Sequence, residues 1–105
     1  MLDFDKLYDE AIALQESGDL DGAIAKLDDI VRQQPDHMLA HSALSVYLGK
    51  KERFDEAVQH AQRVCELDPD DPFSFIAMSL ICQKAGRITE AEQAAMSARR
   101  RQNAE

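Results

Sequence analysis

An internal repeat with a period of 34 residues runs through this sequence. Pro35 and Pro69 lie one period apart, and an alanine recurs in step at positions 23, 57 and 91. Each alanine has a bulky apolar residue three positions before it and a helix-capping residue two positions before it; these are Leu20, Phe54 and Ile88, and Asp21, Asp55 and Thr89. A repeat of this length forms one supersecondary unit that buries a core only by stacking on its neighbours, so a stack of three units is predicted.

Each unit is predicted to form two helices joined by a short turn. Start signals at Asp3, Asp36 and the Asp70-Asp71-Pro72 segment place the first helices at about residues 4–16, 37–49 and 72–85. The second helices are expected to begin after Asp21, Asp55 and Thr89, and proline ends the first two because it cannot extend a helix. The predicted fold class is all-α: an α-solenoid of three helix–turn–helix repeats with six antiparallel helices. Residues 1–105 are expected to form one domain, with repeats at about 4–37, 38–71 and 72–105.

The chain resembles the tetratricopeptide repeat (TPR) family, whose unit is a helix–turn–helix of about 34 residues. The resemblance covers about residues 4–105 and rests on Leu7, Ala11, Leu14, Ala23, Leu27 and Pro35 in the first repeat, Leu44, Leu48, Ala57 and Pro69 in the second, and Phe75, Met78, Cys82 and Ala91 in the third. The departures are Glu10, which stands where Leu44 and Met78 stand, His41 in place of a large aromatic residue, and Asn103 in place of a closing proline. The resemblance implies a non-enzymatic adaptor or scaffold for protein–protein interaction, whose first helices line a concave groove for peptide ligands.

The charge balance argues against several classes of partner. With 20 acidic against 12 basic side chains the net charge is -8, which disfavours nucleic acid and anionic membrane surfaces. No apolar run approaches the roughly 20 residues of a membrane span, and the first residues lack the basic and apolar segments of a signal peptide. An acidic, cytoplasmic protein is expected.

The charge is divided unevenly along the chain. Residues 1–37 carry 10 acidic and 3 basic side chains, a net -7; residues 38–71 carry 7 and 4, a net -3; residues 72–105 carry 3 and 5, a net +2. Two explanations remain open. The cations near the last helix end complement its dipole, or the opposite ends of two copies attract each other.

Residue types with catalytic or metal-binding chemistry are few and poorly placed for it. His37 and His41 are four apart and share a helix face, but a zinc site needs three or four ligands and no third ligand is placed near them. His41 and Ser42 are adjacent on a helix, so they diverge and do not form a base–nucleophile pair. Cys65 and Cys82 fit small buried hydrophobic positions, with a regulatory disulfide as the alternative. No catalytic site, metal or cofactor is predicted.

The predicted binding surface is the lining of the groove that the resemblance implies. The repeat register places four columns in this lining: Asp5/Leu39/Phe73, Tyr8/Ser42/Ile76, Ile12/Val46/Leu80 and Gln15/Gly49/Gln83. Family members that hold the acidic tails of heat-shock chaperones use Lys, Arg and Asn here, whereas this chain has Tyr8, Ile12, Ala43, Phe73 and Ala77. A carboxylate clamp is therefore not expected. The candidate partner-binding residues are Tyr8, Ile12, Leu39, Val46, Phe73, Ile76 and Leu80.

The segment from residue 73 to residue 82 is apolar nearly all round, since Ser74 and Ser79 are its only polar residues. A helix of this kind needs cover on every side. Helical spacing predicts that Phe75, Met78 and Cys82 pack inside the stack and that Phe73, Ile76 and Leu80 face the groove. The predicted function is binding of an apolar or amphipathic protein segment in the groove. The alternative is a self-associating structural subunit, a homo-oligomer built through the same face or through the oppositely charged ends.

Overall fold

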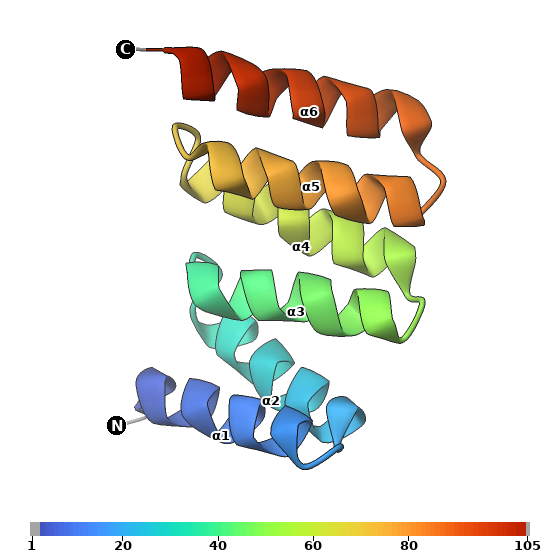
Figure 1. The fold of residues 1–105 in the computed structure, drawn as a ribbon. Helices are drawn as coiled ribbons and strands as arrows, with labels where there is room; N and C mark the ends of the chain where they lie inside the picture. Colours follow the sequence, from blue (N-terminus) through green and yellow to red (C-terminus); the bar gives the residue numbers. More distant parts are fainter. Residues whose placement is uncertain (1–2, 105) are drawn as a thin grey trace.

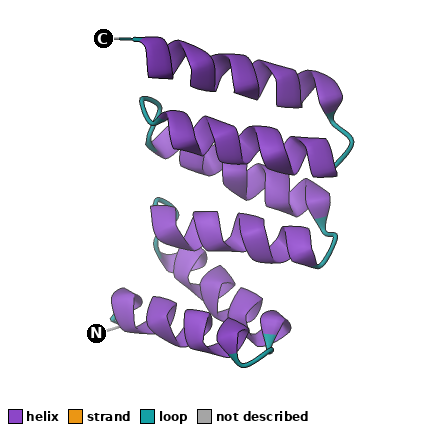
Figure 2. Ribbon diagram, viewed as in Figure 1, coloured by secondary structure: helices purple, strands orange, loops and turns teal. Residues whose placement is uncertain are grey.

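The computed structural model describes residues 3–104, and these residues form six α-helices and no strand (Figure 2). The helices are α1 (Phe4–Glu16), α2 (Leu20–Gln33), α3 (Met38–Lys50), α4 (Phe54–Leu67), α5 (Pro72–Lys84) and α6 (Ile88–Asn103). The predicted all-α solenoid is confirmed, and the first helix of each repeat lies within one residue of its expected bounds. None of the helices between residues 3 and 104 has the length and hydropathy of a membrane span.

The helices stack in chain order, so the two ends of the chain lie at opposite ends of the molecule (Figure 1). Each repeat is an antiparallel helix pair, and the second helix of one pair packs on the first helix of the next, α2 on α3 and α4 on α5. Helices α3 and α5 also touch each other directly. They lie side by side with α4 behind them in Figure 1, in a stack that measures 40 × 29 × 21 Å.

Polar side chains cap the first helix of each repeat. Asp3 and Asp71 each accept a hydrogen bond from a backbone N–H in the first turn, at 3.1 and 3.0 Å. The expected cap at Asp36 is wrong. His37 caps α3 instead, because its Nδ1 accepts a hydrogen bond from the Ala40 N–H at 3.1 Å.

The second helices begin two residues earlier than expected, at Leu20, Phe54 and Ile88. The predicted caps at Asp21, Asp55 and Thr89 are therefore wrong. Asp19 caps α2, since its carboxylate accepts the Gly22 N–H at 2.9 Å. Helices α4 and α6 begin after Arg53 and Arg87 without a side-chain cap. The bulky apolar residue of each repeat is thus the first residue of the helix rather than part of the turn.

Two ion pairs link successive repeats through aspartates at equivalent positions. Asp21 pairs with Lys51 at 3.2 Å, and Asp55, one period later, pairs with Arg87 at 2.6 Å. Both pairs are largely exposed, so each adds little to stability. The aspartate recurs at one position of the repeat, whereas its basic partner stands at a different position in each junction.

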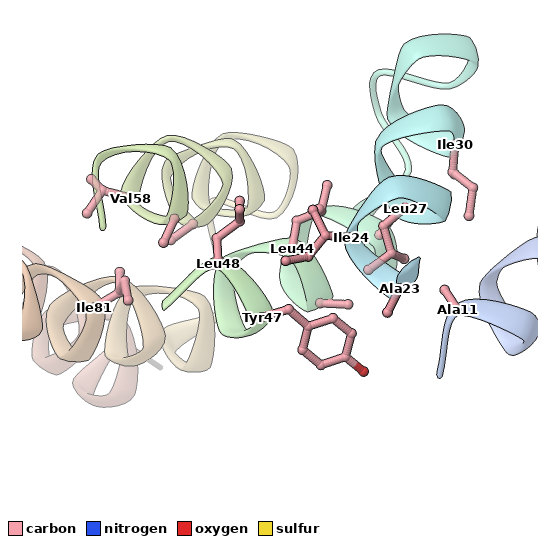
Figure 3. Packing of buried hydrophobic residues seen from close by; sticks show 14 of the residues in the cluster. Ala11, Ala23, Ile24, Leu27, Ile30, Leu44, Tyr47, Leu48, Val58 and Ile81 are labelled. Atoms are coloured by element: carbon pink, nitrogen blue, oxygen red, sulfur yellow. The ribbon is translucent and has the colours of Figure 1, made fainter. Parts of the chain in front are cut away.

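Small residues at the helix crossings and leucines between repeats make the core. Ala23, Ala57 and Ala91 are 0, 0 and 3% exposed. Ser79 shows how closely α5 and α6 approach, because its hydroxyl donates to the Ala91 carbonyl at 2.9 Å. Helix α3 lies at the centre of the core, where Leu44 and Leu48 pack between α2 and α4 (Figure 3).

The packing face of α5 differs from the expectation at Phe75. Cys82 is fully buried, and Met78 packs partly buried against the core. Phe75 is only half-buried, and the guanidinium of Arg101 lies over its ring, 3.9 Å from the centroid. The ring also lines an open hollow of about 280 Å³ between α4, α5 and α6. Because neighbouring side chains do not close around it, Phe75 buries less surface than a core aromatic residue.

Candidate functional site

Four apolar side chains on α3 and α5 project into solvent in two lines. Their exposed fractions are 57% for Leu39, 55% for Val46, 72% for Phe73 and 55% for Leu80. Within each helix the two residues are seven apart, so they lie on one face two turns from each other. Tyr47 and Ile81, which follow Val46 and Leu80 in the chain, are both only 7% exposed. Each helix therefore packs through one face and leaves the other face open.

The other three predicted groove residues are half-buried. Tyr8 stacks on His37, with ring centroids 6.2 Å apart. Ile12 packs against the core from α1, and Ile76 is partly covered on α5. The exposed candidate residues are thus gathered on the second and third repeats.

A hollow of about 110 Å³ lies between α3, α4 and α5. Its lining consists of Ser42, Ser45, Val46, Ala61, Val64, Ser74 and Ala77. Small-molecule sites measure roughly 300–1,000 Å³, so this hollow is too small for a drug-sized ligand.

Lys50 and Lys84 extend the two exposed lines by one helical turn. Each lies four residues after an exposed apolar residue, Val46 or Leu80, and both lysines are exposed. Neither lysine forms an ion pair with another residue between positions 3 and 104. The apolar lines therefore end next to two ammonium groups that have no carboxylate partner among the described residues, and the ammonium of Lys50 lies over the Tyr47 ring, 5.8 Å from its centroid.

These lysines are absent from the residues predicted from the sequence. The last column of the predicted groove lies one position earlier, at Gly49 and Gln83. The spacing of four residues from Val46 and Leu80 was the signal that could have identified them.

Two histidines, His41 and His60, form a partly buried hydrogen-bonded link. His41 is 7% exposed; its Nε2 lies 2.6 Å from the Pro35 carbonyl oxygen, and its Nδ1 lies 2.8 Å from Nδ1 of His60. Because a carbonyl only accepts, His41 donates from Nε2 and accepts at Nδ1 from His60. Burial and the neighbouring His41 lower the pKa of His60. Between residues 3 and 104, no group of three or more His, Cys, Asp or Glu side chains is placed to hold a metal ion.

Both cysteines are buried and free. The Cys65 thiol donates to the Ser74 carbonyl at 3.3 Å. Burial raises the pKa of Cys65 to about 11 and also raises the pKa of Cys82. The thiolate is the reactive form of cysteine, so these two thiols are poor nucleophiles at neutral pH.

The model of the tetratricopeptide repeat family matches residues 8–72, more than half of the chain. The chain belongs to the TPR family. A TPR repeat-containing protein of Pseudomonas aeruginosa is 27% identical over 92 residues, which are 87% of this chain and 16% of that protein. The family resemblance seen in the sequence is confirmed.

Solved structures of several other proteins share the fold of this one. MamA from Desulfovibrio magneticus RS-1 has a TM-score of 0.81 and 23% identity, over 91% of this chain and 54% of that chain. A chain of the CopN–Scc3 complex has a TM-score of 0.89 and 20% identity, over 97% of this chain and 60% of that chain. The second TPR of Spaghetti (RPAP3), bound to the HSP90 peptide SRMEEVD, has a TM-score of 0.79 and 16% identity, over 90% of this chain and 88% of that chain.

The chain spans only part of the length of several proteins that it matches. It spans about a sixth of the length of the Pseudomonas relative and about half of the MamA chain. The likeness at these identities is one of fold.

Proposed function

We propose that this protein is a non-enzymatic interaction module that holds an apolar or amphipathic segment of a partner protein against α3 and α5. One observation carries the proposal: Phe73 and Leu80 are 72 and 55% exposed on a helix whose only charged residue is Lys84. Burial of one such side chain contributes roughly 1.5–3 kcal/mol. A segment that also covers Leu39 and Val46 gains that contribution several times over.

Similar structures support partner binding as the class of function. One of them is a complex of CopN with Scc3, and another is a TPR domain bound to an HSP90 peptide. The present chain differs in the chemistry of its open face. Ala43 and Phe73 stand at clamp positions and cannot donate a hydrogen bond from their side chains. The proposed ligand is therefore an apolar segment rather than a chaperone tail.

Self-association through the same face is the second candidate function. The same four exposed side chains favour it, because a second copy can cover them as well as a different protein can. Sedimentation velocity over a wide concentration range separates the two functions. A constant monomer mass supports partner binding, whereas a defined multimer supports self-association.

Selection from a phage-displayed library of random peptides tests the proposed function. The best selected peptide is then titrated against two variants. Phe73→Ser should lower its affinity by about tenfold or more, because central apolar anchors dominate binding. Ile88→Ser is the matched control, since Ile88 is 57% exposed but lies at the start of α6. Failure to obtain any peptide whose binding depends on Phe73 contradicts the proposal.

A further inference from the structure

The open faces of α3 and α5 carry the same pattern of apolar and basic residues. Helix α1, in the first repeat, carries a different pattern. The pattern is Leu39, Val46 and Lys50 on α3, and Phe73, Leu80 and Lys84 on α5. The equivalent positions on α1 are Asp5, Ile12 and Glu16. Where the first repeat has a carboxylate at each end of the line, the later repeats have an apolar group at one end and an ammonium group at the other.

The charges of the whole helices follow the same division. Apart from histidine, α3 and α5 contain one charged residue each, Lys50 and Lys84. Helix α1 instead contains Asp5, Asp9, Glu10 and Glu16 with a single lysine. In a chain of net charge -8, α3 and α5 thus offer a face without acidic residues of their own. An acidic segment can approach this face without like-charge repulsion from the helices beneath it.

Lys50 and Lys84 differ in their ion pairing from Lys51, the residue that follows Lys50. Lys51 pairs with Asp21 at 3.2 Å across the junction between repeats. Lys50 and Lys84 are in the last turn of their helices, where they complement the helix dipole. Within residues 3–104 both remain without a carboxylate partner. Each can therefore form a charge-assisted hydrogen bond to a carboxylate of a bound chain.

We infer that the segment held over α3 and α5 is an acidic amphipathic one. Its apolar side chains cover Leu39, Val46, Phe73 and Leu80, and its Asp or Glu side chains meet Lys50 and Lys84. This inference rests on the proposed function and adds the charge of the partner to it. The acidic residues of α1 repel the same segment, so the partner is seated on the second and third repeats.

Two charge-reversal variants with the same net charge test the inference in the random-peptide selection. Lys50→Glu/Lys84→Glu reverses the lysines of the open face. Arg99→Glu/Arg100→Glu reverses two exposed arginines of α6 that form no ion pair within residues 3–104, and it controls for the overall change of charge. Peptides selected on the wild type and on the arginine variant should combine apolar residues with Asp or Glu. Peptides selected on the lysine variant should lack the acidic residues.

The best acidic peptide should lose about tenfold in affinity on the lysine variant and less than about twofold on the arginine variant. Circular dichroism melts establish that both variants remain folded. Selected peptides that depend on Phe73 but carry no excess of acidic residues overturn the inference and leave the proposed function standing. If no selected peptide depends on Phe73, the proposed function fails and the inference fails with it. A wild-type multimer that the lysine variant dissociates shows that the occupant is a second copy, and it overturns the inference of a separate partner.

Discussion

The imidazole rings of His41 on α3 and His60 on α4 meet within the second repeat, with their Nδ1 atoms 2.8 Å apart. Nε2 of His41 also lies 2.6 Å from the carbonyl oxygen of Pro35. A chain of hydrogen bonds therefore runs from α4 through α3 to the turn that follows α2. The position that holds a large aromatic residue in the family pattern carries a polar link between repeats in this protein.

This link predicts a loss of stability in mild acid. Burial, and then the neighbouring His41, lower the pKa of His60 below its ordinary 6.5, while Asp28 on α2 and Glu56 on α4 act in the opposite direction. The unfolded chain consequently binds this proton more readily than the folded chain does. The neutral His60 ring therefore makes its full contribution to the free energy of unfolding above about pH 6.5. This contribution is lost as the pH falls through the pKa of His60 in the folded state.

Urea titrations between about pH 8 and about pH 5 measure this effect as a change in the free energy of unfolding. His60→Gln removes the titrating ring and should flatten the dependence on pH. The same pH dependence in the variant and in the wild type would contradict a role for His60.

Ala57 reports on the register of the repeats, because it is completely buried where α3 and α4 cross. Ala57→Leu forces extra atoms into a close-packed crossing and should lower the free energy of unfolding by about 1–3 kcal/mol. Ala25→Leu, on the exposed face of α2, is the matched control and should change little. An unchanged urea midpoint for Ala57→Leu would show that the repeats are out of register.

The order and register of the helices could be predicted because proline and small residues recur at one period. The residues at which the second helix of each repeat begins could not be predicted. In the first repeat Asp19 and Asp21 are both capping residues, and only the hydrogen bond to Gly22 distinguishes the one that caps. In the later repeats the helices begin after Arg53 and Arg87, which carry no capping signal in sequence.

Phe75 and Arg101 should be coupled in stability. The guanidinium lies over the ring at 3.9 Å from its centroid, so a double-mutant cycle with alanine at both positions should give a coupling of about 0.5–1 kcal/mol. Phe75→Ala alone should lower the free energy of unfolding by less than the roughly 3–5 kcal/mol of a fully buried Phe, because the ring is only partly buried. Urea unfolding of the four proteins measures both quantities. A coupling of zero would contradict the stacked arrangement.

The chaperone peptide SRMEEVD, which a similar TPR domain binds, should bind this protein weakly. The peptide is acidic but has few apolar residues, and exposed charge pairs with Lys50 and Lys84 alone are worth little at about 0.15 M salt. Fluorescence anisotropy should give a Kd of about 1 mM or weaker. Saturable binding in the micromolar range would show that a clamp exists despite Ala43 and Phe73.

The open face could be predicted in part. Helical spacing places Phe73 and Leu80 together, and both are exposed in the structure. Spacing within one helix could not show that Tyr8 stacks on His37, because that contact comes from another element. The sequence could not indicate the His41–His60 link for the same reason, since the two residues are 19 positions apart on different helices.

Two adjacent residues of α5 decide whether this helix packs through one face and binds through the other. Ile81 is 7% exposed and Leu80 is 55% exposed, and truncation to alanine removes side chains of equal size from both positions. The measurement is the free energy of unfolding of each variant in urea. We expect Ile81→Ala to lower it by about 2–5 kcal/mol and Leu80→Ala to lower it by less than about 1 kcal/mol. Equal losses in the two variants would show that Leu80 belongs to the core and would contradict a binding role for the open face.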